Sequence, residues 1–247
     1  EIDEIYLATT NNKSDDPLAD MARYLDINLV RGDEKDVLSR FHKVAIKTDC
    51  ENLVRITGDC PLLDPSLISK IIKTFLSKDF DYLSNCFPPS FPDGLDVEIF
   101  KKKVLFKAYQ ECQDISFREH VTPWIREQNR FKVGTFKSEV DYSHLRLTVD
   151  EPEDLEVIRF VVSKLKDKLD FSWEEVVNLE KLYPEKFKLN KKFSRNEGSN
   201  QTTGQKLYRR AKKYIPGGNM LLSKRPEMFL PKGWPSYFSR AKGCKVW

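Results

Sequence analysis

The sequence predicts an α/β fold with a mainly parallel sheet, and three observations support this prediction. Short apolar runs alternate with helical patterns over residues 1–185, which is typical of strands alternating with helices that cover a sheet. Two helical patterns begin beside Pro17 and Pro65, at positions where a missing N–H costs little. Two strand patterns end on an aspartate, Asp59 and Asp150, at the edge of the sheet where ligands of such folds bind.

The expected elements follow one another along the chain. Apolar runs and alternation predict strands over residues 5–10, 28–30, 53–57, 95–100, 132–136 and 144–149. Helical spacing predicts helices that start near residues 15 and 64, and others over 36–46, 104–112, 117–127, 153–165 and 173–183. Asp64 suits the N-cap of its helix because Pro65 follows it. The segment 95–100 alternates apolar with acidic residues, so one face of that strand is polar.

The composition is that of a globular protein in a reducing compartment. Of the 247 residues, 40% are hydrophobic, which is enough for one sizeable core and an appendage. The chain has no apolar run of the length that a membrane-spanning helix needs, about 18 residues, so no membrane association is expected. The five cysteines lie far apart and form no CxxC pair, which favours reduced thiols and a cytoplasmic location.

The charge is distributed unevenly along the chain. Residues 186–247 carry 16 Lys and Arg but two Asp and Glu, whereas residues 1–185 carry 26 and 36. This asymmetry indicates two modules with different roles. We expect a domain over residues 1–190, a linker over residues 191–204 and an irregular appendage over residues 205–247.

The basic appendage has little capacity to fold alone. Residues 205–214 can be helical and residues 215–219 form a turn that breaks this helix. About 43 residues are too few to bury a core of their own. The segment carries no recognisable nucleic-acid motif, so we interpret its charge as a solvated surface and expect no nucleic-acid partner.

Asp59 and Asp150 are the candidates for metal-dependent chemistry. Gly58 precedes Asp59 and lets the backbone pass close to a ligand. Magnesium prefers hard oxygen ligands and completes its coordination with substrate phosphates, so two strand-end carboxylates suit it. The alternatives are a turn before Pro61 for Asp59, and helix capping for the acidic residues that follow Asp150.

A third acidic segment contains Asp93, Asp96 and Glu98. Asp93 and Gly94 can form a hairpin turn, but Asp96 and Glu98 lie on one face of the expected strand, where they could receive sugar hydroxyls or assist a metal. Arg146 lies inside a strand and would suit a phosphate or carboxylate. His120 reads more readily as a hydrogen-bonded structural histidine than as a proton shuttle.

Together these motifs resemble the cytidylyltransferases of spore-coat polysaccharide biosynthesis, relatives of the synthetases that make CMP-activated sugar acids. The resemblance covers residues 1–190 and rests on segments that occur in the same order, namely residues 8–10, 31–33, 54–62, 91–98, 118–123 and 145–154. It implies a three-layer α/β/α fold of the nucleotide-diphosphosugar transferase type. It also implies that a sugar oxygen attacks the α-phosphate of CTP and that pyrophosphate leaves.

The resemblance implies a role for each candidate residue. Asp59 and Asp150 would hold Mg²⁺ and act in catalysis. The nucleotide would be bound by Thr9, Thr10, Arg55 and Gly58, with the two threonines bordering the base. The substrate-binding residues on the sugar side would be Asp93, Asp96, Glu98, His120 and Arg146. CTP and a sugar or sugar acid are the expected ligands, and a homodimer is a possible assembly.

Two departures from the family pattern matter. The family begins with a strand and a basic loop that grips the triphosphate, whereas this chain starts at what resembles the second strand, so little transferase activity is expected of it alone. Residues 205–247 resemble the opening of glutamate-1-semialdehyde aminomutases and other class III aminotransferases. The lysine and phosphate cup that bind pyridoxal phosphate (PLP) in that family lie further along, so PLP is expected only beyond this segment.

Two other functions remain open at the level of sequence. A glycosyltransferase of similar fold would use Asp93 and Asp96 to bind the metal of a nucleotide sugar, and it would release a nucleotide instead of pyrophosphate. A non-catalytic module would bind a nucleotide without turnover or pack against a partner protein.

Overall fold

The computed structural model describes residues 2–166, 170–193, 195, 211–212, 214–215, 241–242 and 245–246. The chain divides by its internal contacts into two compact units, Glu1–Lys191 and Lys192–Trp247. All candidate site residues belong to the first unit. No helix in the described part of the chain is long and apolar enough to cross a membrane.

The strands of the first unit form two sheets. In the smaller one, β1 (Tyr6–Thr10) pairs in parallel with β2 (Asn28–Gly32). The larger one has the order β3-β5-β4-β6, with bounds Asn52–Arg55, Glu98–Lys101, Tyr82–Ser84 and Val133–Thr135. β5 is antiparallel to β3 and β4, and β6 is parallel to β4. Within the larger sheet β5 alone therefore runs against the common direction, and the predicted α/β fold with a mainly parallel sheet is confirmed.

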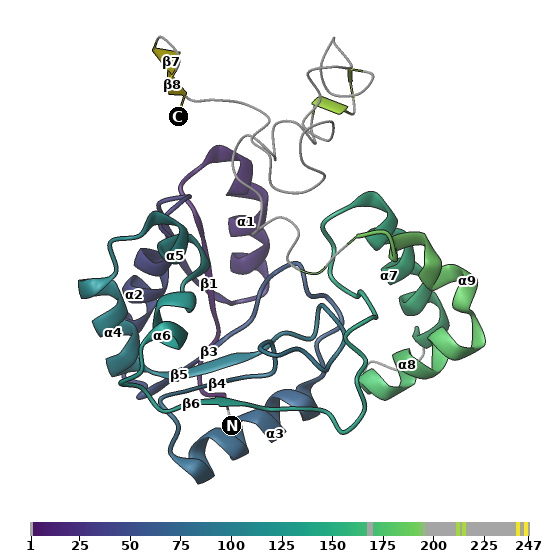
Figure 1. Cartoon of the computed structure of the whole chain (residues 1–247), viewed down its shortest axis with the longest axis horizontal. Helices are drawn as coiled ribbons and strands as arrows, with labels where there is room; N and C mark the ends of the chain where they lie inside the picture. The colour runs from purple at the N-terminus through teal and green to yellow at the C-terminus, as the bar shows by residue number, and fades with distance from the viewer. Residues whose placement is uncertain are drawn as a thin grey trace. The chain divides into compact units, whose positions relative to one another are not determined.

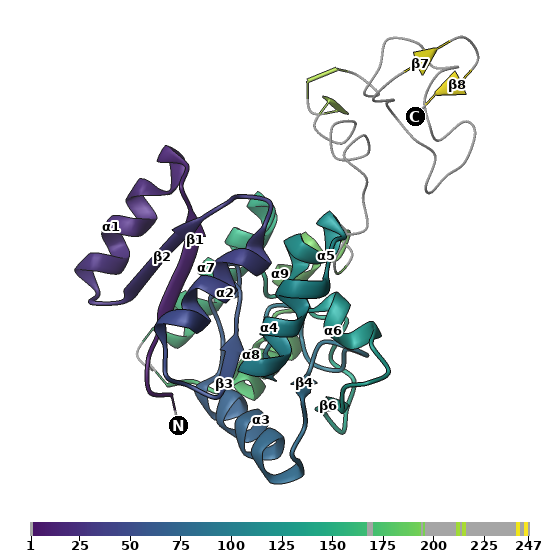
Figure 2. The ribbon, with the colours of Figure 1, turned by 90° about the vertical axis from the view of Figure 1, so that its left-hand side faces the viewer.

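Helices cover both faces of the larger sheet. On one face lie α2 (Val37–Lys47), α4 (Lys102–Glu111), α5 (Ile115–His120) and α6 (Pro123–Glu127), and on the other lies α3 (Pro65–Lys78) (Figure 1). Helix α1 (Asp16–Tyr24) packs beside β1 and β2 (Figure 2). The remaining helices are α7 (Pro152–Leu165), α8 (Trp173–Leu182), α9 (Pro184–Phe187) and two 3₁₀ turns, Lys13–Asp15 and Lys188–Asn190.

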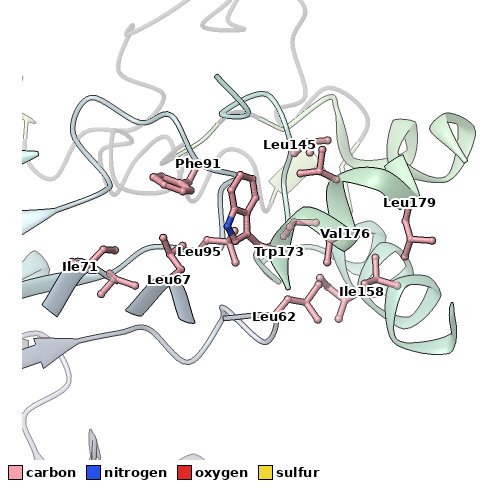
Figure 3. Packing of buried hydrophobic residues seen from close by; sticks show 14 of the residues in the cluster. Leu62, Leu67, Ile71, Phe91, Leu95, Leu145, Ile158, Trp173, Val176 and Leu179 are labelled. Carbon is pink, nitrogen blue, oxygen red and sulfur yellow. The ribbon is translucent and has the colours of Figure 1, made fainter. Parts of the chain in front are cut away.

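The core on the α3 side follows directly from the spacing of apolar residues. Leu67, Ile71 and Phe75 recur on one face of α3 and are at most 2% exposed, as the helical period requires. They pack against the face of the sheet that carries Leu83 and Ile99. The same cluster continues through Phe91, Leu95, Leu145 and Trp173 into α7 and α8 (Figure 3).

The opposite face of the sheet buries the alternate residues of the same strands. Leu53, Tyr82 and Phe100 point toward α2 and α4, where they meet Leu38 and Leu105. Successive side chains of a strand point to opposite faces, so β3, β4 and β5 each contribute to both cores. This arrangement holds the carboxyl ends of the strands in fixed positions.

One expected helix is interrupted. The pattern over residues 117–127 predicts a single helix, but the structure has α5 and α6 separated at Val121, whose φ is 70° and ψ −58°. The N–H of Thr122 donates to the carbonyl of His120 at 2.8 Å, which closes a tight γ-turn. Thr122 has helical backbone, with φ −99° and ψ −16°, directly before Pro123. The helix is therefore broken at Val121, whose positive φ lies outside the helical region.

Two expected strands are shorter than the pattern suggests. Residues 144–149 do not join the sheet and form only an isolated bridge, Asp93 with Arg146. Of residues 95–100, only the part from Glu98 onward pairs in β5. Leu145 and Leu147 instead hydrogen-bond to Asp93, while Leu95 and Val97 hydrogen-bond to Asn85. Alternation alone does not reveal these partners.

Only parts of the second unit belong to the described residues. Residues 211–212 are helical, and β7 (Ala241–Lys242) pairs antiparallel with β8 (Lys245–Val246). Most of the expected linker, of the helix over residues 205–214 and of the turn over residues 215–219 lies outside the described residues.

Candidate active site

Three segments that lie far apart in the sequence meet at the carboxyl end of β3. The N–H of Val149 and the hydroxyl of Thr148 donate to the carbonyl of Asp59 at 2.9 and 3.2 Å. In the same extended segment, the N–H of Leu147 donates to the carbonyl of Asp93 at 2.6 Å. The turn after β3, the loop before β5 and the segment that leads to Asp150 are therefore bonded to each other through their backbones.

Gly94 makes this convergence possible. Its φ is +103°, a conformation that L side chains rarely adopt, and a Cβ at this position would lie 2.5 Å from the carbonyl carbon of Leu147 and the nitrogen of Thr148. Only glycine lets the two backbones approach this closely. The expected Asp93-Gly94 turn thus serves to pack one loop against another.

Arg146 joins three carboxylates at this point. Its guanidinium lies 3.1 Å from Asp93, 2.6 Å from Asp150 and 2.9 Å from Asp154. Burial works to lower the pKa of Arg146, but the bonds to Asp154 and the other carboxylates outweigh it and raise the pKa above its usual value. Arg146 is therefore a fixed cation that orients these side chains.

The carboxylates around Arg146 differ in exposure. Asp154 is fully buried and accepts hydrogen bonds from the N–H groups of Asp150 and Glu151 as well as from Arg146. The Asp150 side chain is 52% exposed. The buried carboxylate caps α7 and stabilises the loop, which leaves Asp150 as the member of this group that faces solvent.

Asp59 and Asp96 lie near the same thiol. Burial raises the pKa of Cys60 to about 12, and the negative charges of Asp59 and Asp96 contribute to this rise. The hydroxyl of Thr57 lies 3.1 Å from the Cys60 sulfur. The Cys60 thiol stays protonated at neutral pH. The charged ligands near it are therefore the carboxylates of Asp59 and Asp96.

The donor set fits a cation that takes few protein ligands. Within the described ranges, no group of three or more His, Cys, Asp and Glu residues could hold a metal ion. A divalent ion at Asp59 and Asp150 would complete its shell with phosphate oxygens and water, which is the coordination that Mg²⁺ prefers. The carboxylates of Asp59, which is half-buried, and Asp150, which is exposed, supply hard oxygen ligands of the right kind.

Arg55 and Glu98 form a buried ion pair at the ends of β3 and β5. Glu98 is 3% exposed, and besides Arg55 it accepts hydrogen bonds from the hydroxyls of Tyr82 at 2.5 Å and Thr122 at 2.6 Å. Burial works to raise the pKa of Glu98, but Arg55 and these hydroxyls hold it below its usual value. The structure thus places Arg55 and Glu98 in contact with each other, with Glu98 buried and the Arg55 side chain 19% exposed.

The turn after β1 is held by its own carboxylate. Asp15 accepts from the hydroxyls of Thr9 and Thr10 at 2.6 and 2.7 Å, and these bonds lower the pKa of Asp15. Arg31 donates to the carbonyls of Thr10 and Asn12 at 2.7 and 2.8 Å. The threonine hydroxyls therefore shape the loop, and its backbone and Arg31 form the outer surface there.

Gly58 and His120 are the remaining candidate residues. Gly58 is exposed, and a Cβ there would meet no atom within 4 Å, so protein packing does not require a glycine at this position. His120 is half-buried at the end of α5, directly before the turn at Val121.

Several site residues could not be found by reading the sequence. Tyr82, Thr122 and Asn190 reach the site through side chains on separate elements, and Asn190 donates to Asp154 and to the carbonyl of Arg146 at 2.9 and 3.0 Å. Nothing in their local sequence marks them. Asp154 did carry a signal as a helix-capping residue, and the structure confirms the capping box.

Comparison with known proteins gives a consistent set of relatives. Residues 1–198 match the profile of a family described as Cytidylyltransferase. The spore coat polysaccharide biosynthesis protein SpsF of Bacillus subtilis is 29% identical over 184 residues, which is 72% of this chain and 74% of that protein. An uncharacterized protein of Methanocaldococcus jannaschii is 37% identical over 160 residues, 64% of this chain and 65% of that protein.

A solved structure has the same fold. The structure of a cytidylyltransferase from Leptospira borgpetersenii superimposes with a TM-score of 0.70 at 29% identity, and the match covers 80% of this chain and 79% of that one. The chain spans just under two thirds of the length of the Methanocaldococcus protein.

Proposed function

Since the chain belongs to the cytidylyltransferase family, a family of nucleotidyltransferases, we propose that it transfers CMP from CTP to an oxygen of a sugar or sugar acid. The sugar oxygen attacks the α-phosphate, the bond to the β-phosphate breaks, and pyrophosphate leaves. The similarity to a spore coat polysaccharide biosynthesis protein supports a role in making a surface polysaccharide.

The observation that carries this proposal is the meeting of Asp59 with the segment before Asp150. The two residues are 91 positions apart in the sequence, yet the backbone of Asp59 is bonded to Thr148 and Val149. A triphosphate bound at the carboxyl ends of the strands would meet both carboxylates. Magnesium held by Asp59 and Asp150 would neutralise charge on the transferred phosphate.

The other residues would prepare this site. Arg146 fixes the position of Asp150, and its charge limits the repulsion among the neighbouring carboxylates. The exposed backbone at Gly58 would allow phosphates to approach closely. The loop of Thr9 and Thr10 would border the base through its backbone, since both hydroxyls are bonded to Asp15.

On the sugar side we retain Asp93, Asp96 and His120 as candidates. Asp96 lies close to Asp59 around Cys60, so a sugar held by Asp96 would be near the reacting phosphate. Glu98 and Arg55 are bonded to each other in the interior, and we assign them a positioning role instead of contact with sugar or nucleotide.

The test is pyrophosphate release from CTP, Mg²⁺ and a panel of neutral, carboxylated and phosphorylated sugars. Asp59→Asn and Asp150→Asn should each lower kcat/KM by at least about a hundredfold, as expected for removal of one preorganised charged group. Asp20→Asn removes an exposed carboxylate on α1 and should leave the rate unchanged. Unchanged rates in both site variants would contradict the metal assignment.

The products also separate the rival functions. A glycosyltransferase of this fold would release a nucleotide from a nucleotide sugar, whereas a non-catalytic module would bind CTP without releasing pyrophosphate. The aminotransferase-like start at residues 205–247 and a homodimeric assembly stay predictions, and most of residues 205–247 lie outside the described residues.

A further inference from the structure

Asn190 lies near the C-terminal end of the first unit and contacts the carboxylate group around Arg146. It belongs to the 3₁₀ turn Lys188–Asn190 and is 2% exposed. Its Nδ2 donates to the carboxylate of Asp154 at 2.9 Å and to the backbone carbonyl of Arg146 at 3.0 Å. One buried side chain therefore holds both the backbone of Arg146 and the carboxylate that the guanidinium of Arg146 contacts.

The two acceptors explain why an asparagine suits this position. An amide nitrogen carries two N–H groups, and here each group meets one oxygen, of Asp154 and of the Arg146 carbonyl. The amide oxygen cannot donate, so the reverse orientation would set it against two acceptors. An aspartate would repel Asp154, and a leucine of similar size would remove both donors. The surroundings thus determine both the residue type and its orientation.

Asp154 and Arg146 extend this contact to Asp150. The two oxygens of Asp154 each accept from the Arg146 guanidinium at 2.9 Å, and one of them also accepts from the N–H of Asp150 at 3.1 Å. The Nη2 of Arg146 also donates to the carboxylate of Asp150 at 2.6 Å. Asp150 is therefore held at its backbone by Asp154 and at its side chain by Arg146, and Asn190 contacts both of these residues.

The turn that carries Asn190 is itself anchored on both sides. Phe187, which precedes it, is 2% exposed and packs edge-on against Phe160 of α7, with 6.2 Å between the ring centroids. Lys191, which follows it, lies 3.5 Å from Glu180 of α8 and is the last residue of the first unit. The end of the first unit is therefore fixed to α7 and α8, and through Asn190 to the group around Arg146.

We propose that Asn190 is a positioning residue for Asp150, so that the end of the first unit determines where this carboxylate lies. The inference rests on the proposed function, in which Asp150 holds Mg²⁺. Because the Asp150 side chain is 52% exposed, its position depends on hydrogen bonds more than on packing. Loss of one donor from a buried polar network weakens the bonds that remain, so the effect of Asn190 reaches Asp150 through Asp154 and Arg146.

Hydrogen exchange of the Arg146 guanidinium measures this link without any ligand. Its Nε–H signal is assigned through bonds by NMR on ¹⁵N,¹³C-labelled full chain, and its exchange with water is then followed. Asn190→Leu should speed the exchange about tenfold, as expected for one lost hydrogen bond. Val161→Ala removes only buried apolar groups from α7 and should leave the rate unchanged. An unchanged rate in Asn190→Leu, or an equal rise in both variants, overturns the proposal.

Kinetics test whether the link matters for the reaction. With the acceptor that gives pyrophosphate, Asn190→Leu should lower kcat about tenfold to a hundredfold, as expected for a displaced catalytic group. The Mg²⁺ concentration that gives half of the maximal rate should rise, because the carboxylate that holds the ion is less well placed. Val161→Ala, assayed below its melting temperature, should leave both quantities unchanged.

A double-mutant cycle shows whether Asn190 acts through Asp150. In an Asp150→Asn background the carboxylate that Asn190 positions is already absent, so Asn190→Leu should change kcat by less than about twofold. A loss of the same size in both backgrounds would mean that Asn190 acts by another route, and this result overturns the proposal.

Failure of this inference is distinguishable from failure of the proposed function. An enzyme in which Asp150→Asn is slow and Asn190→Leu is as fast as the wild type overturns the role of Asn190 and leaves nucleotidyl transfer standing. If no acceptor gives pyrophosphate, the proposed function fails, and the exchange rate at Arg146 still decides whether Asn190 holds the network. If Asn190→Leu does not fold, Asn190→Ser retains one donor and should give an intermediate exchange rate, whereas a wild-type rate would overturn the proposal.

Discussion

Glu98 shows at the scale of one residue how the sheet edge is stabilised. Its two carboxylate oxygens receive donors from β3, from β4 and from the turn before α6, through Arg55, Tyr82 and Thr122. A buried charge requires such compensation, since removal of one partner leaves the other desolvated and alone. The pair therefore ties three elements together at the base of the candidate site.

Glu98→Gln should lower the free energy of unfolding by about 3 kcal/mol, because Arg55 would remain buried without its counter-ion. Urea unfolding followed by circular dichroism measures this change. Glu111→Gln breaks the exposed pair with Arg130 and should cost less than about 1 kcal/mol. Equal effects in the two variants would show that burial does not control the strength of the Glu98 pair.

Gly94 and Gly58 both lie near the candidate site but differ in their surroundings, so an alanine at each position should have a different effect on stability. Gly94→Ala should destabilise the fold by more than about 2 kcal/mol, because its Cβ would overlap the backbone of Leu147 and Thr148. Gly58→Ala should leave the melting temperature nearly unchanged, since a Cβ there meets nothing within 4 Å. It should lower kcat/KM, because the added methyl group would hinder the approach of the substrate phosphates to the backbone. Thermal unfolding and pyrophosphate release measure the two effects. A stable Gly94→Ala protein would contradict the packing argument.

At the scale of elements, Asp64 connects two helices. One oxygen accepts from the N–H groups of Ser66 and Leu67 at the start of α3, and the other accepts from the N–H of Trp173 at the start of α8, at 3.0 Å. Helix starts leave N–H groups without partners. A single carboxylate thus satisfies donors of two helices that are distant in sequence.

Asp64→Ala should therefore cost more than the loss of an ordinary cap. We expect about 2 to 4 kcal/mol, the sum of a lost cap on α3 and an unsatisfied buried N–H on α8. Asp114→Ala removes a cap from α5 alone and should cost about 1 kcal/mol. Chemical unfolding of both variants measures the difference. If Asp64→Ala costs no more than Asp114→Ala, the bond to Trp173 contributes nothing to stability.

The break between α5 and α6 depends on both local sequence and tertiary contacts. Pro123 lies in the first turn of α6, where its missing N–H costs little. The hydrogen bond from Thr122 to Glu98 and the burial of Val121 then fix the direction in which α6 continues. The direction depends on a contact with a strand 24 residues away, which local pattern cannot specify.

At the scale of the whole molecule, the buried carboxylates determine how stability depends on acid. Burial works to raise the pKa values of Asp64, Glu98 and Asp154, yet hydrogen bonds and cations hold all three below their usual values. A carboxyl group with a depressed pKa in the fold stabilises the protein above its unfolded pKa, near 4, and this stability is lost as the pH falls below that value. We expect the melting temperature to fall between pH 6 and pH 3.

The variant Asp154→Asn provides the check on this acid dependence. Its melting temperature at pH 7 should be lower than that of the wild type. Its melting temperature should also fall less between pH 6 and pH 3, because the carboxylate that takes up the proton is absent. Calorimetry at several pH values measures both slopes. Parallel slopes would show that Asp154 does not contribute to the acid sensitivity.

The opposite dependence is expected at alkaline pH. Burial raises the pKa of Cys60 to about 12, whereas an unfolded cysteine ionises near 8.5. The unfolded state then releases its proton first, so stability should be lost as the pH rises above about 8.5. Cys60→Ala should reduce this loss in the same calorimetric series.

The sequence by itself determined the α/β class, most helices and strands, and the order of the acidic motifs. These features depend on local spacing of apolar residues, on caps and on prolines, which act within a few residues of the chain. Asp59 and Asp150 could be selected from the sequence because each follows an apolar run and precedes a helical pattern.

Tertiary structure alone decided which of these residues lie close together and which are already bonded to other side chains of the protein. Alternation placed Asp96 and Glu98 on one strand face, but contacts with Arg55, Tyr82 and Thr122 bury Glu98, while Asp96 remains in a loop near Cys60. Burial and pairing depend on distant segments, and local sequence carries no information about such contacts.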